Sequence, residues 1–134
     1  MLDTNIVLDL LLFSDPATQA LKQALASAKI QWLSTQAMRD ELERVLSYPK
    51  IMARLAVTEL DAAKVLQRFD AQARLVEVAP KASVTCRDAD DQKFIDLAVQ
   101  HQAMLLSKDR AVLCMKKRLF TLSVRAQTAL EFEP

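Results

Sequence analysis

The sequence predicts an α/β fold in which a parallel sheet of short strands is covered by helices on both faces. Short apolar runs alternate with longer helical patterns along the chain, and this order is typical of parallel sheets. The 134 residues are enough to bury one core, so we expect a single domain over residues 1–134. No apolar run approaches the ~20 residues of a membrane span, so we expect no membrane segment.

The first elements are a very short strand and two helices. Residues 1–3 are the stub of a strand, and residues 5–13 follow with a helical pattern. The dipeptide Asp15-Pro16 restarts the helix, because Asp is a favoured N-cap and Pro fits the first helical position. Residues 17–28 are rich in Ala, Leu and Lys and are therefore expected to be helical, and residues 30–33 are the next strand.

Three helices and a strand are expected in the middle of the chain. Ser34 is the expected N-cap of the first helix, which stops before Pro49. Thr58 to Asp61 has the spacing of a capping box, with Asp in place of Glu or Gln, and opens the third helix. The expected elements are helices over residues 34–47, 50–56 and 58–73 and a strand over residues 74–78.

A long loop opens the last part of the chain. Residues 80–89 show no periodicity, and loops of this length are often functional. The expected elements after it are helices over residues 91–100 and 110–116, buried strands over residues 104–107 and 119–122, and a short helix over residues 125–132.

The chain has no glycine, although an average usage of ~7% predicts about nine. This absence excludes the dinucleotide-binding turn, the Walker A loop and the nucleophile elbow, because each depends on glycine backbone. Any chemistry is therefore expected to rest on side chains. Asn5 is the only asparagine and is the residue best suited to a tight turn into the first helix, so we expect strained backbone there.

Charge and cysteine content fit a small soluble domain. Eighteen basic and seventeen acidic residues give a net charge of +1, so a polyanion would have to bind locally rather than through the overall field. Cys86 and Cys114 have no C-x-x-C spacing, and no signal peptide precedes them. We therefore expect a reduced, cytoplasmic protein.

Carboxylates are the best candidates for chemistry. His101 is the only histidine, so a His-based zinc site or a serine triad would lack partners. Asp3 and Asp109 each follow a predicted strand, and ligands of parallel sheets bind at the carboxyl ends of strands. The alternative for both residues is a structural N-cap, since each precedes a helix.

Glu41 points to the buried side of its predicted helix. At 100° per residue it falls inside the apolar arc that contains Met38 and Leu42, whereas Asp40 and Glu43 fall outside it. A carboxylate on a buried face is costly unless it is paired, protonated or bound to a metal. The alternative to a metal is an arginine partner.

The acids between residues 88 and 91 form a third group. Asp90 is the expected helix N-cap, while Asp91 projects toward the core side that Phe94 and Leu97 mark. Carboxylates that converge without cations raise one another's pKa, and a divalent metal relieves this repulsion. A ligand set of carboxylate oxygens alone favours Mg²⁺ or Mn²⁺, which suits phosphoryl chemistry.

Four segments of the chain carry these acids in a fixed order. They are Leu2-Asp3-Thr4-Asn5-Ile6-Val7-Leu8, Glu41-Leu42 with Val45-Leu46 and Pro49-Lys50, Asp88-Ala89-Asp90-Asp91-Gln92-Lys93-Phe94, and Leu105-Leu106-Ser107-Lys108-Asp109. Together they resemble the successive motifs of the PIN domain family, and most closely the branch of toxin components of prokaryotic toxin–antitoxin systems. The resemblance covers essentially the whole chain.

The resemblance implies a three-layer α/β/α sandwich with a central parallel sheet of four to five short strands. It also implies a ribonuclease that hydrolyses RNA phosphodiester bonds with metal-activated water, uses Mg²⁺ or Mn²⁺ and leaves a 5′-phosphate. The implied partners are RNA, a cognate antitoxin and a second copy of the chain. The implied catalytic and metal-binding residues are Asp3, Glu41, Asp91 and Asp109, and the supporting residues are Asn5, Ser107, Asp88 and Asp90.

The chain departs from the family pattern at two places. Family members usually carry more apolar residues before the first acid, which leaves open a native start upstream of Met1. Glycine is common in the family where His101 and Gln102 end a helix, so we expect strained backbone at that turn.

Basic residues near the acids are the candidates for RNA contacts. They are Lys108, Arg110 and Arg87, whereas the run of residues 116–118 also fits a solvated face. The alternative function is a PIN-fold module that binds RNA or a partner without cutting. A receiver-like phosphoacceptor is disfavoured, because residues 75–80 offer no acceptor aspartate.

Overall fold

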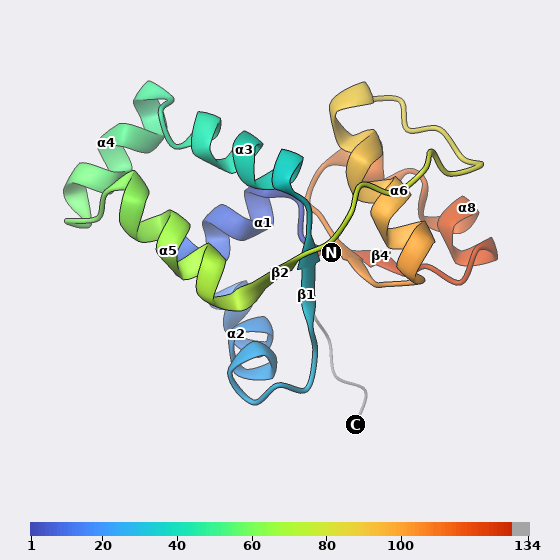
Figure 1. The fold of residues 1–134 in the computed structure, drawn as a ribbon, viewed down its shortest axis with the longest axis horizontal. Helices are drawn as coiled ribbons and strands as arrows, with labels where there is room; N and C mark the ends of the chain where they lie inside the picture. Colours follow the sequence, from blue (N-terminus) through green and yellow to red (C-terminus); the bar gives the residue numbers. More distant parts are fainter. Residues whose placement is uncertain (130–134) are drawn as a thin grey trace.

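The computed structural model describes residues 1–129, in which short parallel strands lie between two groups of helices (Figure 1). The first half contains α1 (Thr4–Leu8), the π-helix η1 (Asp9–Phe13), the 3-10 helix η2 (Pro16–Thr18), α2 (Gln19–Ala26), β1 (Trp32–Ser34), α3 (Gln36–Val45) and α4 (Pro49–Val57). The second half contains α5 (Ala62–Gln72), β2 (Ala73–Leu75), the 3-10 helix η3 (Ala89–Asp91), α6 (Gln92–His101), β3 (Leu105–Leu106), α7 (Arg110–Leu113), α8 (Lys116–Thr121) and β4 (Ala126–Gln127).

The strands form two parallel ladders, β1 with β2 and β3 with β4. Leu2 adds a parallel bridge to Leu106, whose N–H donates to Met1 O over 2.9 Å and whose carbonyl accepts from Asp3 N over 3.1 Å. The parallel direction and the stub at residues 1–3 were predicted correctly. A continuous sheet of four to five strands is not seen in residues 1–129, because each strand has only two or three residues and Asp3 already caps a helix.

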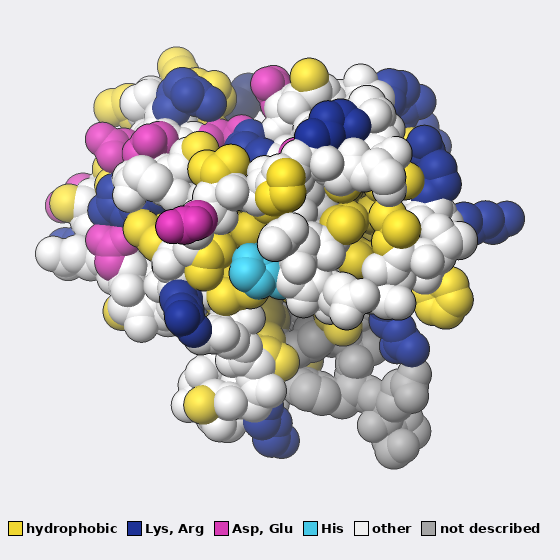
Figure 2. Space-filling view, turned by 45° about the vertical axis from the view of Figure 1, so that its right-hand side comes forward, with side chains coloured by type: hydrophobic (Ala, Val, Ile, Leu, Met, Phe, Trp, Pro, Cys, Tyr) yellow, Lys and Arg dark blue, Asp and Glu magenta, His cyan; other side chains and the backbone are white. Residues whose placement is uncertain are grey.

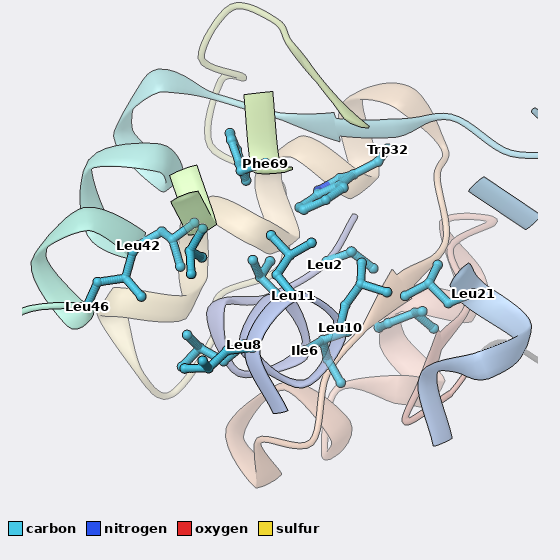
Figure 3. Packing of buried hydrophobic residues seen from close by; sticks show 14 of the residues in the cluster. Leu2, Ile6, Leu8, Leu10, Leu11, Leu21, Trp32, Leu42, Leu46 and Phe69 are labelled. Carbon is cyan, nitrogen blue, oxygen red and sulfur yellow. The ribbon is translucent and has the colours of Figure 1, made fainter. Parts of the chain in front are cut away.

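Neighbouring residues of the central strands point into two different hydrophobic clusters. Leu106 packs with α1, α3 and α5, whereas Leu105 packs with α6, α7 and α8. In the same way, Leu2 belongs to the cluster of Leu106, whereas Met1 belongs to the cluster of Leu105. Because successive side chains of a strand point to opposite faces, the two clusters lie on opposite sides of the strands. Figure 3 shows the cluster that contains Leu2, where side chains from α1, η1, α2, β1, α3 and α5 meet.

Two predicted helix caps were wrong by one to three residues. Ser34 lies in β1, and the N-cap of α3 is Thr35, whose hydroxyl accepts from Met38 N over 3.3 Å. The predicted capping box does not form: Asp61 is the N-cap of α5, and Thr58 ends α4. In each case a residue one or three positions further on, with a side-chain oxygen that can accept the bond, takes the cap.

The prediction for the end of the chain was also wrong. Residues 119–122 were expected to be a strand, but they form the end of α8 and its C-cap. β4 lies where a helix over residues 125–132 was expected. Met115 and Leu119 are buried four residues apart while Phe120 is 66% exposed, which is the pattern of a helix. Residues 130–132 lie outside the described residues.

Five residues other than glycine have positive φ at the ends of helices, a position that usually takes glycine. Gln102, with φ 49°, is one of them and confirms the expected strain at the His101-Gln102 turn. The same expectation for Asn5 was wrong, because Asn5 lies within α1. The five residues are Ser14, Ala28, Glu59, Gln102 and Ser123.

Replacing Ala28 by Gly is expected to stabilise the protein by about 1 kcal/mol. Ala28 has φ 56°, where its Cβ is crowded and glycine has no steric penalty. The measurement is urea unfolding. The matched control is Ala26→Gly, at the exposed last residue of α2, which is expected to destabilise by up to about 1 kcal/mol. Equal destabilisation by both substitutions would contradict the strain at Ala28.

The structure also bears on membrane association. Among residues 1–129, every helix is too short or too polar to cross a bilayer.

Candidate active site

Four acids predicted from the sequence line one cavity of about 670 Å³. Asp3 precedes α1, Glu41 lies on α3, Asp91 ends η3 and Asp109 precedes α7. The cavity is thus built from four separate stretches of the chain. Its other lining residues are Thr4, Asn5, Leu8, Val45, Tyr48, Pro49, Lys50, Ile51 and Phe94.

Asp3 and Asp109 are connected through Ser107. Asp3 is only 3% exposed, accepts from Ile6 N over 3.1 Å and accepts a short hydrogen bond from the Ser107 hydroxyl. Ser107 Oγ also accepts from Asp109 N over 3.0 Å. Asp3 and Asp109 are both helix N-caps, which was the alternative to a chemical role. Both side chains also line the cavity. The fully buried Ser107 fixes their relative position from beneath.

Asp88, Asp91 and Asp109 form a compact group. One carboxylate oxygen of each lies within 4.8 Å of the others. Asp91 Oδ2 is buried and has no hydrogen-bond partner among the residues that the structure describes. Asp90 was expected to be the N-cap here, but Asp88 takes that role by accepting from Asp90 N over 2.9 Å. Asp90 itself is exposed.

The environment of this group favours a proton or a cation. Burial raises the pKa of Asp91 to about 7. The neighbouring side chain of Asp109 adds to this shift, both through a hydrogen bond and through its charge. Burial also raises the pKa of Asp3, although the hydrogen bonds from Ser107 and Ile6 N oppose that effect. Near neutral pH the cavity therefore holds carboxylates that gain from an added positive charge.

The donor set fits a divalent metal ion. An orphaned buried oxygen beside two further carboxylates is the kind of site that a hard cation occupies. No His or Cys belongs to the group, and oxygen ligands alone suit Mg²⁺ or Mn²⁺ better than zinc. Asp88, Asp91 and Asp109 are the residues that would hold the ion.

Glu41 lies in the cavity but has partners of its own. Its Oε1 accepts from Lys93 Nζ over 3.0 Å, and its Oε2 accepts a short hydrogen bond from the Thr4 hydroxyl. The inward direction predicted from the helix angle is confirmed, since Glu41 lines the cavity. The partner is a lysine of α6 rather than the arginine that was considered. Glu41 does not belong to the group formed by Asp88, Asp91 and Asp109.

The predicted RNA-binding residues differ in their surroundings. Lys108 forms a short ion pair with Asp9, which is buried. Arg87 and Arg110 are exposed and adjoin Asp88 and Asp109 in sequence. On the face shown in Figure 2, the acidic side chains lie mainly on the left with Lys and Arg side chains among them, whereas Lys and Arg side chains without acids lie along the right edge.

Sequence reasoning assigned no role to four residues that contact the site. Thr4 and Lys93 bind Glu41, while Tyr48 and Lys50 line the cavity beyond it. Thr4, Lys93 and Lys50 lie within the segments that carry the family resemblance, and this position was the only available signal. The Glu41 to Lys93 contact spans 52 positions, so no local pattern reveals it.

Comparison with known proteins supports the resemblance found in the sequence. A family model of the PIN domain matches residues 1–111, which include all four acids of the cavity. No curated protein and no solved structure gives a significant match. The matched residues cover most of the chain and contain α1 to α6, β3 and the acids that follow or precede them. The chain therefore belongs to the PIN domain family and has its α/β nuclease-type fold.

Proposed function

We propose that the protein is a ribonuclease that depends on Mg²⁺ or Mn²⁺ and hydrolyses RNA phosphodiester bonds. The observation that carries this proposal is the buried, unpartnered Oδ2 of Asp91 beside Asp88 and Asp109 in an acid-lined cavity. Family membership supports the same reaction class, because PIN domains are generally metal-dependent nucleases.

The chain's own residues divide the work within the cavity. A divalent ion supplies Lewis acidity toward the phosphate and lowers the pKa of water. Asp88, Asp91 and Asp109 would hold this ion, and Asp3, whose position Ser107 fixes, would reinforce the negative potential from beneath. Glu41 lines the cavity wall, where Lys93 and Thr4 hold its two carboxylate oxygens.

The RNA is proposed to approach over the exposed basic side chains around the acids. Arg87 and Arg110 flank the metal ligands, and Lys50 lines the cavity itself. Lys108 contributes less, because Asp9 already neutralises it. Tyr48, which is 49% exposed and lines the same cavity, offers a ring for a base to stack on.

We further propose that the protein is the toxin of a toxin–antitoxin pair. The order and spacing of its four acidic segments support this assignment, since they resemble the toxin branch of the family most closely. Its partners would then be a cognate antitoxin and a second copy of the chain.

Metal removal is the direct test of the proposed reaction. Purified protein is incubated with single-stranded RNA in EDTA and then with added Mg²⁺ or Mn²⁺, and the ends of the products are identified. We expect cleavage only with metal and products that carry a 5′-phosphate. Cleavage that persists in EDTA would refute the proposal. RNA binding without cleavage under all conditions would instead favour a non-catalytic binding module.

A further inference from the structure

The basic side chain of Lys93 forms an ion pair with Glu41, one of the acids that line the cavity. Its Nζ lies 3.0 Å from Glu41 Oε1 and 2.6 Å from the carbonyl oxygen of Asp90, and 4.9 Å from the centre of the Phe94 ring. The ammonium is thus held from three sides. It joins α3 to the turn η3, whose last residue is the metal ligand Asp91.

Glu41 and Asp91 differ sharply in how their oxygens are satisfied. Both oxygens of Glu41 have a donor, one from Lys93 and one from Thr4. Asp91 Oδ2 has none among the described residues, although it is buried. The cavity therefore contains one carboxylate that already has a cation and a separate group of carboxylates that lacks one.

A divalent ion on Glu41 would lie close to the Lys93 ammonium. Two cations at such a distance repel strongly in a partly buried site. Either Lys93 leaves, which breaks its bonds to Glu41 and Asp90, or the second ion does not bind. The group formed by Asp88, Asp91 and Asp109 can take an ion without breaking the contacts of Lys93 with Glu41 and Asp90.

We propose that Lys93 is a built-in counter-ion that keeps Glu41 from ligating a metal and limits the cavity to a single divalent ion. Lys93 is then a positioning residue, and Glu41 is a member of the acidic quartet that does not ligate the metal. This inference rests on the proposed function, since it presumes that the three-carboxylate group binds a divalent ion.

The test counts the ions that bind in the absence of RNA. Isothermal titration with Mn²⁺ is expected to give one ion for the wild-type protein and two for Lys93→Met, which keeps an unbranched side chain of similar length but removes its charge. Lys93→Arg keeps the charge and is expected to give one ion. Lys50→Met is the matched control, because Lys50 lines the same cavity without a carboxylate partner within residues 1–129, and it too is expected to give one.

A second variant keeps the proposal testable if Lys93→Met does not fold. Glu41→Gln is expected to change the Mn²⁺ affinity of the otherwise wild-type protein by less than about twofold. A loss of tenfold or more, which is typical when a ligand or its close support is removed, would show that Glu41 holds the metal and would overturn the inference.

The outcomes separate this inference from the proposed function. A folded Lys93→Met protein that still binds one ion overturns the role of Lys93 and leaves the metal-dependent reaction intact. A wild-type protein that binds two ions does the same. A wild-type protein that binds no Mn²⁺ overturns both.

Discussion

Replacing Asp91 by Asn is expected to lower the rate of metal-dependent RNA cleavage by about a thousandfold. Asp91 carries the buried oxygen without a partner among the described residues and belongs to the three-carboxylate group. A metal ion contributes several kcal/mol of transition-state stabilisation, and each 1.4 kcal/mol is worth about a factor of ten in rate. The measurement is the single-turnover rate at saturating Mn²⁺. Asp40→Asn, on the exposed face of α3, is the control and is expected to cleave normally.

The same substitution is expected to stabilise the metal-free protein at high pH. The pKa of Asp91 is raised from 3.8 to about 7 in the folded state, so the fold disfavours its charged form. The stability tied to the protonated carboxyl is complete below about pH 4 and is lost as the pH rises through about 7. Asp91→Asn cannot ionise and does not lose this contribution.

Urea unfolding in EDTA at pH 4.5 and pH 8 measures the effect. We expect Asp91→Asn to gain unfolding free energy relative to the wild type when the pH is raised from 4.5 to 8. A variant that cleaves RNA at the wild-type rate, or that loses stability relative to the wild type as the pH rises, would contradict the role given to Asp91. A gain in stability combined with a loss of activity is the signature of a functional carboxylate.

Helical periodicity accounts for the part of the site that could be predicted from the sequence. The direction of Glu41 and the inward projection of Asp91 follow from angles within single helices, and both residues line the cavity. Which charges meet across the cavity is a property of the packed fold. The contacts of Lys93 with Glu41 and of Ser107 with Asp3 span 52 and 104 positions, and no local pattern encodes them.

The strands were harder to predict than the helices for a related reason. A strand of two or three residues shows no alternation that separates it from the end of a helix. Ala126 and Gln127 form β4 by pairing with Leu105 and Leu106, which lie about twenty positions earlier in the chain. The amphipathic pattern of α5 or α6, by contrast, is visible within the helical segment itself. Caps failed where two adjacent residues could both supply the oxygen, as at Ser34 and Thr35.

Phe69 is expected to be among the most costly side chains to remove. It is buried on α5, and its ring meets Trp32 of β1 edge to face, with centres 5.0 Å apart (Figure 3). Replacing a buried Phe by Ala costs about 3–5 kcal/mol, and domains of this kind are stable by only about 5–15 kcal/mol. Phe69→Ala should therefore bring the protein near the limit of folding. Phe120→Ala, at an exposed position of α8, is the matched control and should change stability by less than about 0.5 kcal/mol.

The unfolding of Phe69→Ala can be followed by the fluorescence of Trp32. Trp32 is the only tryptophan in the sequence, and its ring contacts the ring of Phe69. The loss of Phe69 is expected to affect the site through the same hydrophobic cluster. Leu42 of α3 and Leu46, the C-cap of α3, pack in this cluster, and Glu41 precedes Leu42 on the helix. At temperatures below its unfolding transition, Phe69→Ala should therefore cleave RNA more slowly than the wild-type protein. Phe120→Ala should cleave RNA at the wild-type rate. A loss of stability below about 1 kcal/mol would mean that the helices refill the space of the ring, and α3 would then hold Glu41 independently of α5.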